Sequence, residues 1–86
     1  MELTFRLSAF KHGVTGESIK HAVAHSLFID DDFQGTEPPK VLIIGPDPAG
    51  NLLELVGQFS SDDTLVVFHA MAIRPSILKM IGPLDR

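Results

Sequence analysis

The stretch KVLIIGPDPAGNLLELVGQF, Lys40 to Phe59, predicts the centre of the fold. Its first part, KVLIIGPD, is β-branched and apolar on both faces, as expected of an interior strand. The segment DPAGN, Asp47 to Asn51, consists largely of residues that favour tight turns, and it leads into NLLELVGQF. The whole stretch therefore predicts a β-hairpin inside a sheet.

The residues that follow the hairpin predict one more strand and a short helix. SSDD, Ser60 to Asp63, has the composition of a turn, and TLVVFHAMAI (64–73) is apolar and β-branched like the hairpin strands. Pro75 suits the first position of a helix, so PSILKMI is expected to be helical. Gly82-Pro83 is expected to end that helix.

The residues before the hairpin predict a helical N-terminal part. Thr15 is a good N-cap, Glu17 suits the positive end of a helix dipole, and apolar residues recur at helical spacing over 16–27. ELTFRL (2–7) fits either a short strand or the lead into a first helix. The segment FIDDDFQGTEPPK (28–40) suits a strand end followed by an exposed loop.

This order of elements predicts one small α+β domain over residues 1–86. Short turns cannot make parallel crossovers, so we expect an antiparallel meander sheet of three or four strands. The N-terminal helical segment and the short C-terminal helix are expected to cover one face of this sheet.

Side-chain alternation predicts which strand residues face the core. Leu53, Leu55 and Phe59 point one way along their strand, and we expect them to be core. Glu54 and Gln58 point the other way and are expected on the more open face. In 64–73 both alternating sets are apolar, so the side on which His69 lies stays open.

Composition limits the classes of function. The chain has seven Lys and Arg against eleven Asp and Glu, a net charge of −4, which argues against broad, sequence-independent binding to nucleic acid but allows a local basic pocket. It has no cysteine, which excludes disulfides, thiolate metal sites and a cysteine nucleophile. We expect a cytoplasmic protein without a membrane span.

Four short motifs and their order resemble a known family. They are KHGV (11–14) before an acidic helix start, the DDD run (30–32), LIIG (42–45) before a hairpin, and HAMAIRP (69–75). This order, over roughly residues 8–80, resembles the BrnT-type toxins of bacterial toxin–antitoxin modules and their uncharacterised actinobacterial toxin-like relatives.

The resemblance implies a fold like that of the RelE and ParE toxins, RNA cleavage without a metal or cofactor, and inhibition by a cognate antitoxin. Carried over by position, it marks Lys11, His12, His69 and Arg74 as site residues. The chain departs from the family in two respects. It has Arg74, PSIL and Lys79 where BrnT-type toxins have an arginine-rich stretch, and it is acidic where they tend to be basic.

The chemistry of RNA cleavage gives each of these residues a role. The reaction needs one proton taken from a 2′-hydroxyl and one given to the leaving 5′-oxygen, which suits His12 and His69. The phosphate needs cationic donors, which suits Arg74 and Lys11. Glu54 is an alternative base. The hypothesis requires the loop that carries His12 to lie beside Arg74 at the start of the last helix.

Two other groups favour structural explanations over metal binding. His21 and His25 share a helix face, but HAVAH lacks the glutamate of a zinc-binding HExxH motif. The Asp30–Asp32 run lacks the glycine and distal glutamate of a calcium loop, which favours a solvated strand end.

Two functions are therefore carried forward. The first is an endoribonuclease toxin, or a degenerate relative of one, that acts on RNA and is neutralised by an antitoxin. The second is a non-enzymatic interaction module of the same fold, whose exposed sheet edge or acidic face binds a protein partner or a second copy of the chain.

Overall fold

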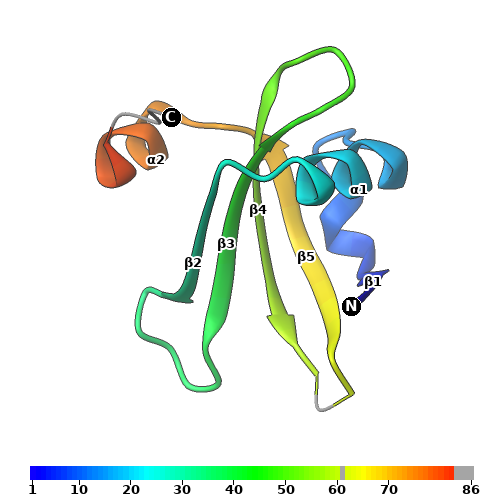
Figure 1. The fold of residues 1–86 in the computed structure, drawn as a ribbon, viewed down its shortest axis with the longest axis vertical. Helices are drawn as coiled ribbons and strands as arrows, with labels where there is room; N and C mark the ends of the chain where they lie inside the picture. The colour runs from blue at the N-terminus through cyan, green and yellow to red at the C-terminus, as the bar shows by residue number, and fades with distance from the viewer. Residues whose placement is uncertain (61, 83–86) are drawn as a thin grey trace.

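A computed structural model describes residues 1–60 and 62–82, so Ser61 of the predicted turn and Pro83 of the predicted helix end lie outside the described residues. The described chain is an α+β fold with one five-stranded sheet, two α-helices and a 3₁₀ turn (Figure 1). The elements in chain order are β1 (Glu2–Phe5), η1 (Leu7–Phe10), α1 (Gly16–Ala24), β2 (Phe28–Phe33), β3 (Lys40–Pro46), β4 (Leu52–Phe59), β5 (Thr64–Ala72) and α2 (Pro75–Ile81).

The predicted hairpin is confirmed. β3 and β4 pair antiparallel, with Ile43 opposite Leu55. Asp47 shapes the connection, because its Oδ1 accepts hydrogen bonds from the backbone N–H groups of Ala49 at 3.0 Å and Asn51 at 2.8 Å. These bonds close the turn and fix the register of the two central strands.

The prediction of a purely antiparallel meander is wrong. The strand order is β1-β5-β4-β3-β2, and β1 pairs with β5 in parallel, with Glu2 opposite Thr64. The argument from short turns holds for the strands that follow one another from β2 to β5, whereas β1 reaches β5 across most of the chain. The ambiguous segment at residues 2–7 contributes an edge strand.

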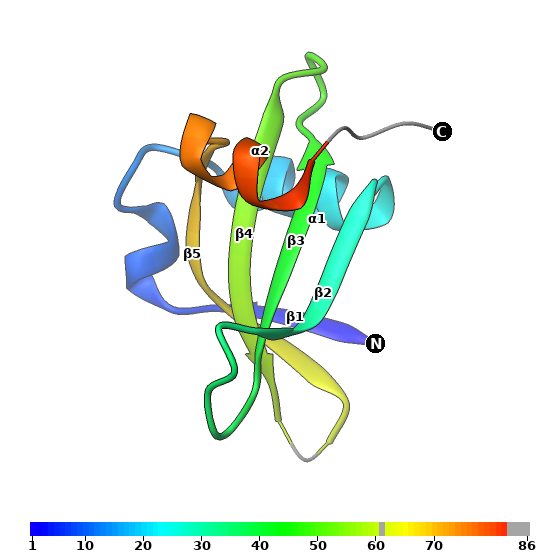
Figure 2. The same cartoon turned by 90° about the vertical axis from the view of Figure 1, so that its left-hand side faces the viewer.

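The two helices lie on opposite faces of the sheet, so the prediction that both cover one face is wrong (Figures 1 and 2). Ile19 and Ala22 of α1 pack with alternate residues of β3 and β4, such as Ile43 and Leu55. Ile77 of α2 packs on the other side, with these residues: Phe33, Leu42, Ile44 and Val56. Because α2 is short, it covers only part of its face of the sheet.

Gly45 of β3 allows α1 to approach the sheet closely. A Cβ atom at this position would collide with the backbone carbonyl of Ala22. The carbonyl end of α1 can therefore lie directly on the strand, which a larger residue would prevent.

A β-bulge in β5 changes the alternation that the sequence predicts. His69 lies opposite Val56, but Val67 lies opposite Gly57, which leaves Phe68 as an extra residue. Val67 consequently packs on the α1 side, while Phe68 belongs to the cluster on the other face. Gly57 permits this local geometry, because a Cβ there would lie 2.5 Å from the Val66 carbonyl oxygen.

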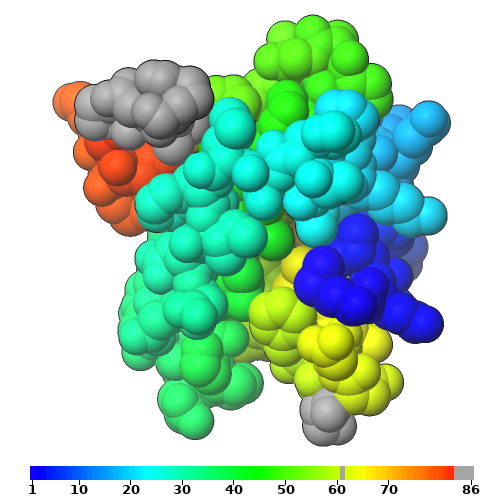
Figure 3. All heavy atoms as spheres, in the orientation of Figure 1, coloured from blue at the N-terminus to red at the C-terminus, as the bar shows by residue number. Residues whose placement is uncertain are grey.

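β2 forms one outer edge of the sheet, and the chain from β2 into the following loop lies at the surface in the space-filling view (Figure 3). Ile29 of β2 is 57% exposed. Within the described ranges, neither helix is long and apolar enough to cross a membrane.

Candidate functional site

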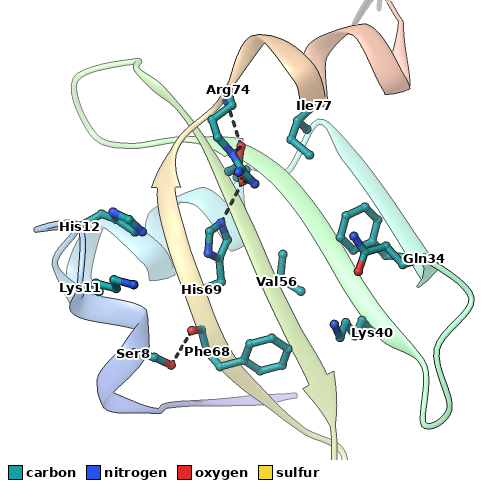
Figure 4. Close-up of a pocket in the computed structure, with 12 residues that line it drawn as sticks. Ser8, Lys11, His12, Gln34, Lys40, Val56, Phe68, His69, Arg74 and Ile77 are labelled. Atoms are coloured by element: carbon teal, nitrogen blue, oxygen red, sulfur yellow. Dashed lines mark hydrogen bonds and ion pairs between the residues drawn. The ribbon is translucent and has the colours of Figure 1, made fainter.

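A pocket of about 380 Å³ lies over the sheet face that α2 leaves open (Figure 4). The loop after η1 borders it on one side, the start of α2 lies at its top, and the loop after β2 borders it on the far side. All five residues that the sequence predicted as a site line this pocket: Lys11, His12, Glu54, His69 and Arg74. They come from segments up to 63 positions apart, so the fold brings together what the sequence separates.

Glu54 lies beneath the pocket with its carboxylate fully engaged. Its side chain is 1% exposed, and Oε1 accepts from Nε2 of His69 at 2.9 Å and from Nη2 of Arg74 at 2.8 Å. Oε2 accepts from the backbone N–H of Arg74 at 2.9 Å. A buried carboxylate is tolerated because charged partners of this kind compensate for the loss of water.

These contacts decide the protonation state of Glu54. Burial acts to raise its pKa, but hydrogen bonds from the Arg74 side chain and backbone and from His69 outweigh burial and lower it. A carboxylate with a lowered pKa is a weak base, so the geometry favours Glu54 as the residue that positions its two neighbours over the role of alternative base. Glu54 lies on the less covered face of the sheet, opposite Leu53 and Leu55, as predicted, but its side chain is buried there because Arg74 at the start of α2 closes over it.

Arg74 is held at the N-cap of α2 in an extended conformation, with Pro75 beginning the helix. Its Nε lies 3.1 Å from Oε2 of Glu54, and together with Nη2 it forms one bonded edge toward the carboxylate. The guanidinium has five N–H donors, and no hydrogen bond within the described part of the chain uses Nη1. The side chain is 51% exposed, so the second edge of the guanidinium is available to a ligand.

His69 and His12 form a pair at the centre of the pocket. Their ring centroids are 5.9 Å apart, and the rings are inclined by 75°. Because the carboxylate of Glu54 can only accept, Nε2 of His69 carries the proton in that bond and Nδ1 is left with a lone pair when the ring is neutral. Two imidazoles at this separation can both bond to oxygens of one phosphate group.

The loop that carries Lys11 and His12 is folded back onto β5. Ser8 in η1 donates a hydrogen bond from Oγ to the carbonyl oxygen of the bulge residue Phe68 at 2.6 Å. Gly13 follows with φ of +82°, a conformation that favours glycine, and the Thr15 side chain then caps α1 by accepting from the N–H of Ser18. His12 and Arg74 therefore border one cavity, which the hypothesis from the sequence required.

Seven further residues that line the pocket were not predicted as site residues, namely Ser8, Phe33, Gln34, Lys40, Val56, Phe68 and Ile77. Lys40 and Gln34 lie across the sheet from His12 in Figure 4. Nothing in the linear sequence indicates that these positions border the same cavity as the histidines. A complete strand order would have given the signal, since Phe33 and Lys40 are paired neighbours on β2 and β3.

The described charged residues are unevenly distributed around the pocket. Within residues 1–60 and 62–82, Lys11, Lys40 and Arg74 line it together with one acidic residue, Glu54, whose charge is neutralised by Arg74. The net charge of −4 therefore does not describe the pocket, which is cationic. This is the local basic pocket that the composition left open.

The remaining histidines and the aspartate run lie elsewhere. His21 donates from Nδ1 to the Pro46 carbonyl at 2.8 Å, and its ring lies 4.4 Å from that of His25. The Asp30 carboxylate accepts from the N–H of Asp32. In residues 1–60 and 62–82, no group of three or more His, Asp or Glu residues has the arrangement of a metal site.

The chain has no match among protein-family models, curated proteins or solved structures. The fold and the pocket therefore define the protein only as an α+β domain with a paired-histidine, cation-lined site.

Proposed function

We propose that this chain is a metal-independent endoribonuclease, the toxin component of a type II toxin–antitoxin module. The observation that carries the proposal is the convergence of His12, His69, Arg74 and Lys11 on one pocket. Two imidazoles supply a base and an acid, and two cationic side chains supply a phosphate site. The motifs that resemble BrnT-type toxins support the biological role, with RNA as substrate, a cognate antitoxin as partner and the cytoplasm as the place of action.

In this proposal His69 is the base. Nδ1 takes the proton from the 2′-hydroxyl, the 2′-oxygen attacks phosphorus, and the imidazolium that forms is stabilised by Glu54. His12 gives a proton to the leaving 5′-oxygen as the P–O5′ bond breaks. The products are a 2′,3′-cyclic phosphate and a free 5′-hydroxyl, with no oxidant, reductant or metal required.

The free edge of Arg74 and the ammonium group of Lys11 bind the nonbridging oxygens, whose negative charge increases in the transition state. Donors that are preorganised in this way are typically worth about 3–4 kcal/mol each in activation free energy. Arg74 is preorganised because its other edge is already bonded to Glu54.

The test is cleavage of RNA by the purified chain in the presence of EDTA. We expect products that end in 2′,3′-cyclic phosphate and no cleavage of the same sequence with 2′-deoxy sugars. His12→Gln is expected to lower kcat by about 10²–10⁴-fold, as loss of a general acid does. His25→Gln is the matched control, because His25 is an exposed histidine of the neighbouring helix surface.

Cleavage that persists at full rate in His12→Gln, or an RNA left intact by a folded wild-type chain, would overturn the proposal. In cells, induced expression of the wild type should arrest growth and His12→Gln should not. Arg74→Lys is preferable to Arg74→Ala for the arginine, because it keeps a positive charge near the buried Glu54 carboxylate.

A second candidate is a non-catalytic protein-interaction module, favoured by the surface of β2. This outer strand exposes Ile29 beside acidic residues, so a partner or a second copy of the chain could pair with it. In that case the wild type would be harmless and inactive on RNA, and Ile29→Lys would convert a homodimer into a monomer in sedimentation experiments.

A further inference from the structure

The pocket extends beyond the residues that the proposed reaction uses. From His69 on β5 it continues over Val56 on β4 to Lys40 at the start of β3 and Gln34 after β2 (Figure 4). Neighbouring strands are about 4.8 Å apart, so β5 and β3 are separated by roughly 10 Å. That separation leaves room for the nucleoside next to the phosphate that the histidines would hold.

The floor of this extension is aromatic and apolar. Phe68 is half-buried and lines the cavity because the bulge turns it to the same face as His69. Phe33 and Val56 pack beside it in the same cluster. A partly exposed aromatic ring on such a floor offers a face on which a nucleobase can stack.

Gln34 lies at the far wall in an unusual backbone conformation. Its φ is +65°, a left-handed value that glycine, asparagine and aspartate adopt more readily than glutamine. Gln34 is exposed, and its side-chain amide makes no hydrogen bond to another residue of the described ranges. Conformations of this kind concentrate at functional sites, where the side chain that they position has a use.

We infer that this half of the pocket is a nucleobase subsite that gives the enzyme its sequence preference, an inference that rests on the proposed ribonuclease function. The base stacks on Phe68, the amide of Gln34 bonds to its edge, and Lys40 binds the adjoining phosphate. An amide offers a donor beside an acceptor, which matches base edges that present the complementary pair, adenine among them.

The first experiment measures kcat/KM on short RNAs that differ only in the nucleotide next to the cleaved bond. We expect the wild type to prefer one base and Gln34→Gly to lose that preference. Glycine relieves the left-handed conformation, so this variant should be at least as stable as the wild type in urea. Phe68→Leu keeps an apolar side chain on the floor and is expected to raise KM roughly 5- to 100-fold.

The second experiment measures binding without catalysis, by titration calorimetry with a nucleoside 3′-monophosphate and with inorganic phosphate. The wild type is expected to bind the nucleotide more tightly, and Phe68→Leu should remove most of the difference. His25→Gln should behave as the wild type in both experiments.

The outcomes separate the two proposals. If the wild type binds the nucleotide more tightly than phosphate but cleaves no RNA, the ribonuclease proposal fails and the base subsite stands. If it cleaves RNA without base preference, or with a preference that Gln34→Gly retains, the subsite inference fails and the ribonuclease stands. Equal affinity for nucleotide and phosphate would also overturn the subsite.

Discussion

Replacing Glu54 by glutamine tests how far the site and the fold depend on the same carboxylate. The substitution keeps the size of the side chain but removes its charge. Two donors, Nε2 of His69 and the guanidinium of Arg74, lose the anion that they bond. The amide nitrogen of glutamine would also face one of the N–H groups that now point at Oε1 or Oε2, which places two donors opposite each other.

The magnitude follows from the burial of the carboxylate. Breaking a buried ion pair typically costs about 3–5 kcal/mol. The side chain of Arg74 is 51% exposed and can be solvated after the change, so we expect a cost below this range, about 2–3 kcal/mol in the free energy of unfolding. A chain of 86 residues is stable by only about 4–13 kcal/mol, so the variant should remain folded but be clearly weakened.

The assay is urea unfolding followed by circular dichroism. With a slope of about 1 kcal/mol per molar urea for a domain of this size, the midpoint should fall by about 2–3 M. Glu37→Gln in the exposed loop before β3 is the control for loss of one negative charge, and its midpoint should stay within about 0.5 M of the wild type.

The effect should depend on pH in a defined direction. The pKa of Glu54 is lowered in the folded state, so its contribution to stability is complete above its ordinary value of 4.5 and is lost as pH falls through the lowered value. The difference between wild type and Glu54→Gln should be full at pH 7 and shrink below pH 4.5. A difference that stays constant down to pH 3, or an unchanged midpoint at pH 7, would refute the ionic role of Glu54.

Two further substitutions test how the site is positioned. Gly57→Ala places a Cβ atom 2.5 Å from the Val66 carbonyl oxygen, so it should lower the free energy of unfolding by about 1–3 kcal/mol. It should also lower the rate of RNA cleavage, because the shifted strand displaces His69. A variant with the activity and stability of the wild type would contradict the role of the bulge. Thr15→Ala removes the hydroxyl that caps α1 by accepting a hydrogen bond from the N–H of Ser18 at 3.1 Å. It should lower the free energy of unfolding by about 1 kcal/mol in a urea titration, whereas Thr15→Ser, which keeps the hydroxyl, should be nearly as stable as the wild type. A Thr15→Ala chain as stable as the wild type would show that the cap contributes little.

Local sequence patterns predicted the central hairpin of the sheet correctly. The apolar runs and the turn residues from Asp47 to Asn51 indicated the hairpin, and Thr15 marked the start of α1, because these signals act over a few neighbouring positions. The parallel pairing of β1 with β5 and the place of α2 on the opposite face depend on contacts between distant segments, which no local pattern encodes.

The sequence indicated five residues that line one pocket, but it indicated less of their surroundings. Residue types and motifs indicated His12, His69 and Arg74, and the structure brings them to one pocket. Strict alternation would have put His69 on the side of Val67, because an inserted residue such as Phe68 leaves no clear sign in an apolar strand. Gln34 was not predicted, because a local sequence pattern shows neither its left-handed backbone conformation nor its place across the sheet from His12.

The bonds that join Glu54 to Arg74 have an evolutionary consequence. The backbone N–H of Arg74 fastens the start of α2 to the sheet through this carboxylate, so selection for a folded chain maintains both residues whether or not the chain has an activity. If the proposed activity were lost in a descendant, the exposed His12 could be replaced at little cost to folding, whereas this pair could not. Among diverged sequences, the Glu54–Arg74 pair would therefore indicate common ancestry, and only the two histidines would indicate whether the proposed activity is retained.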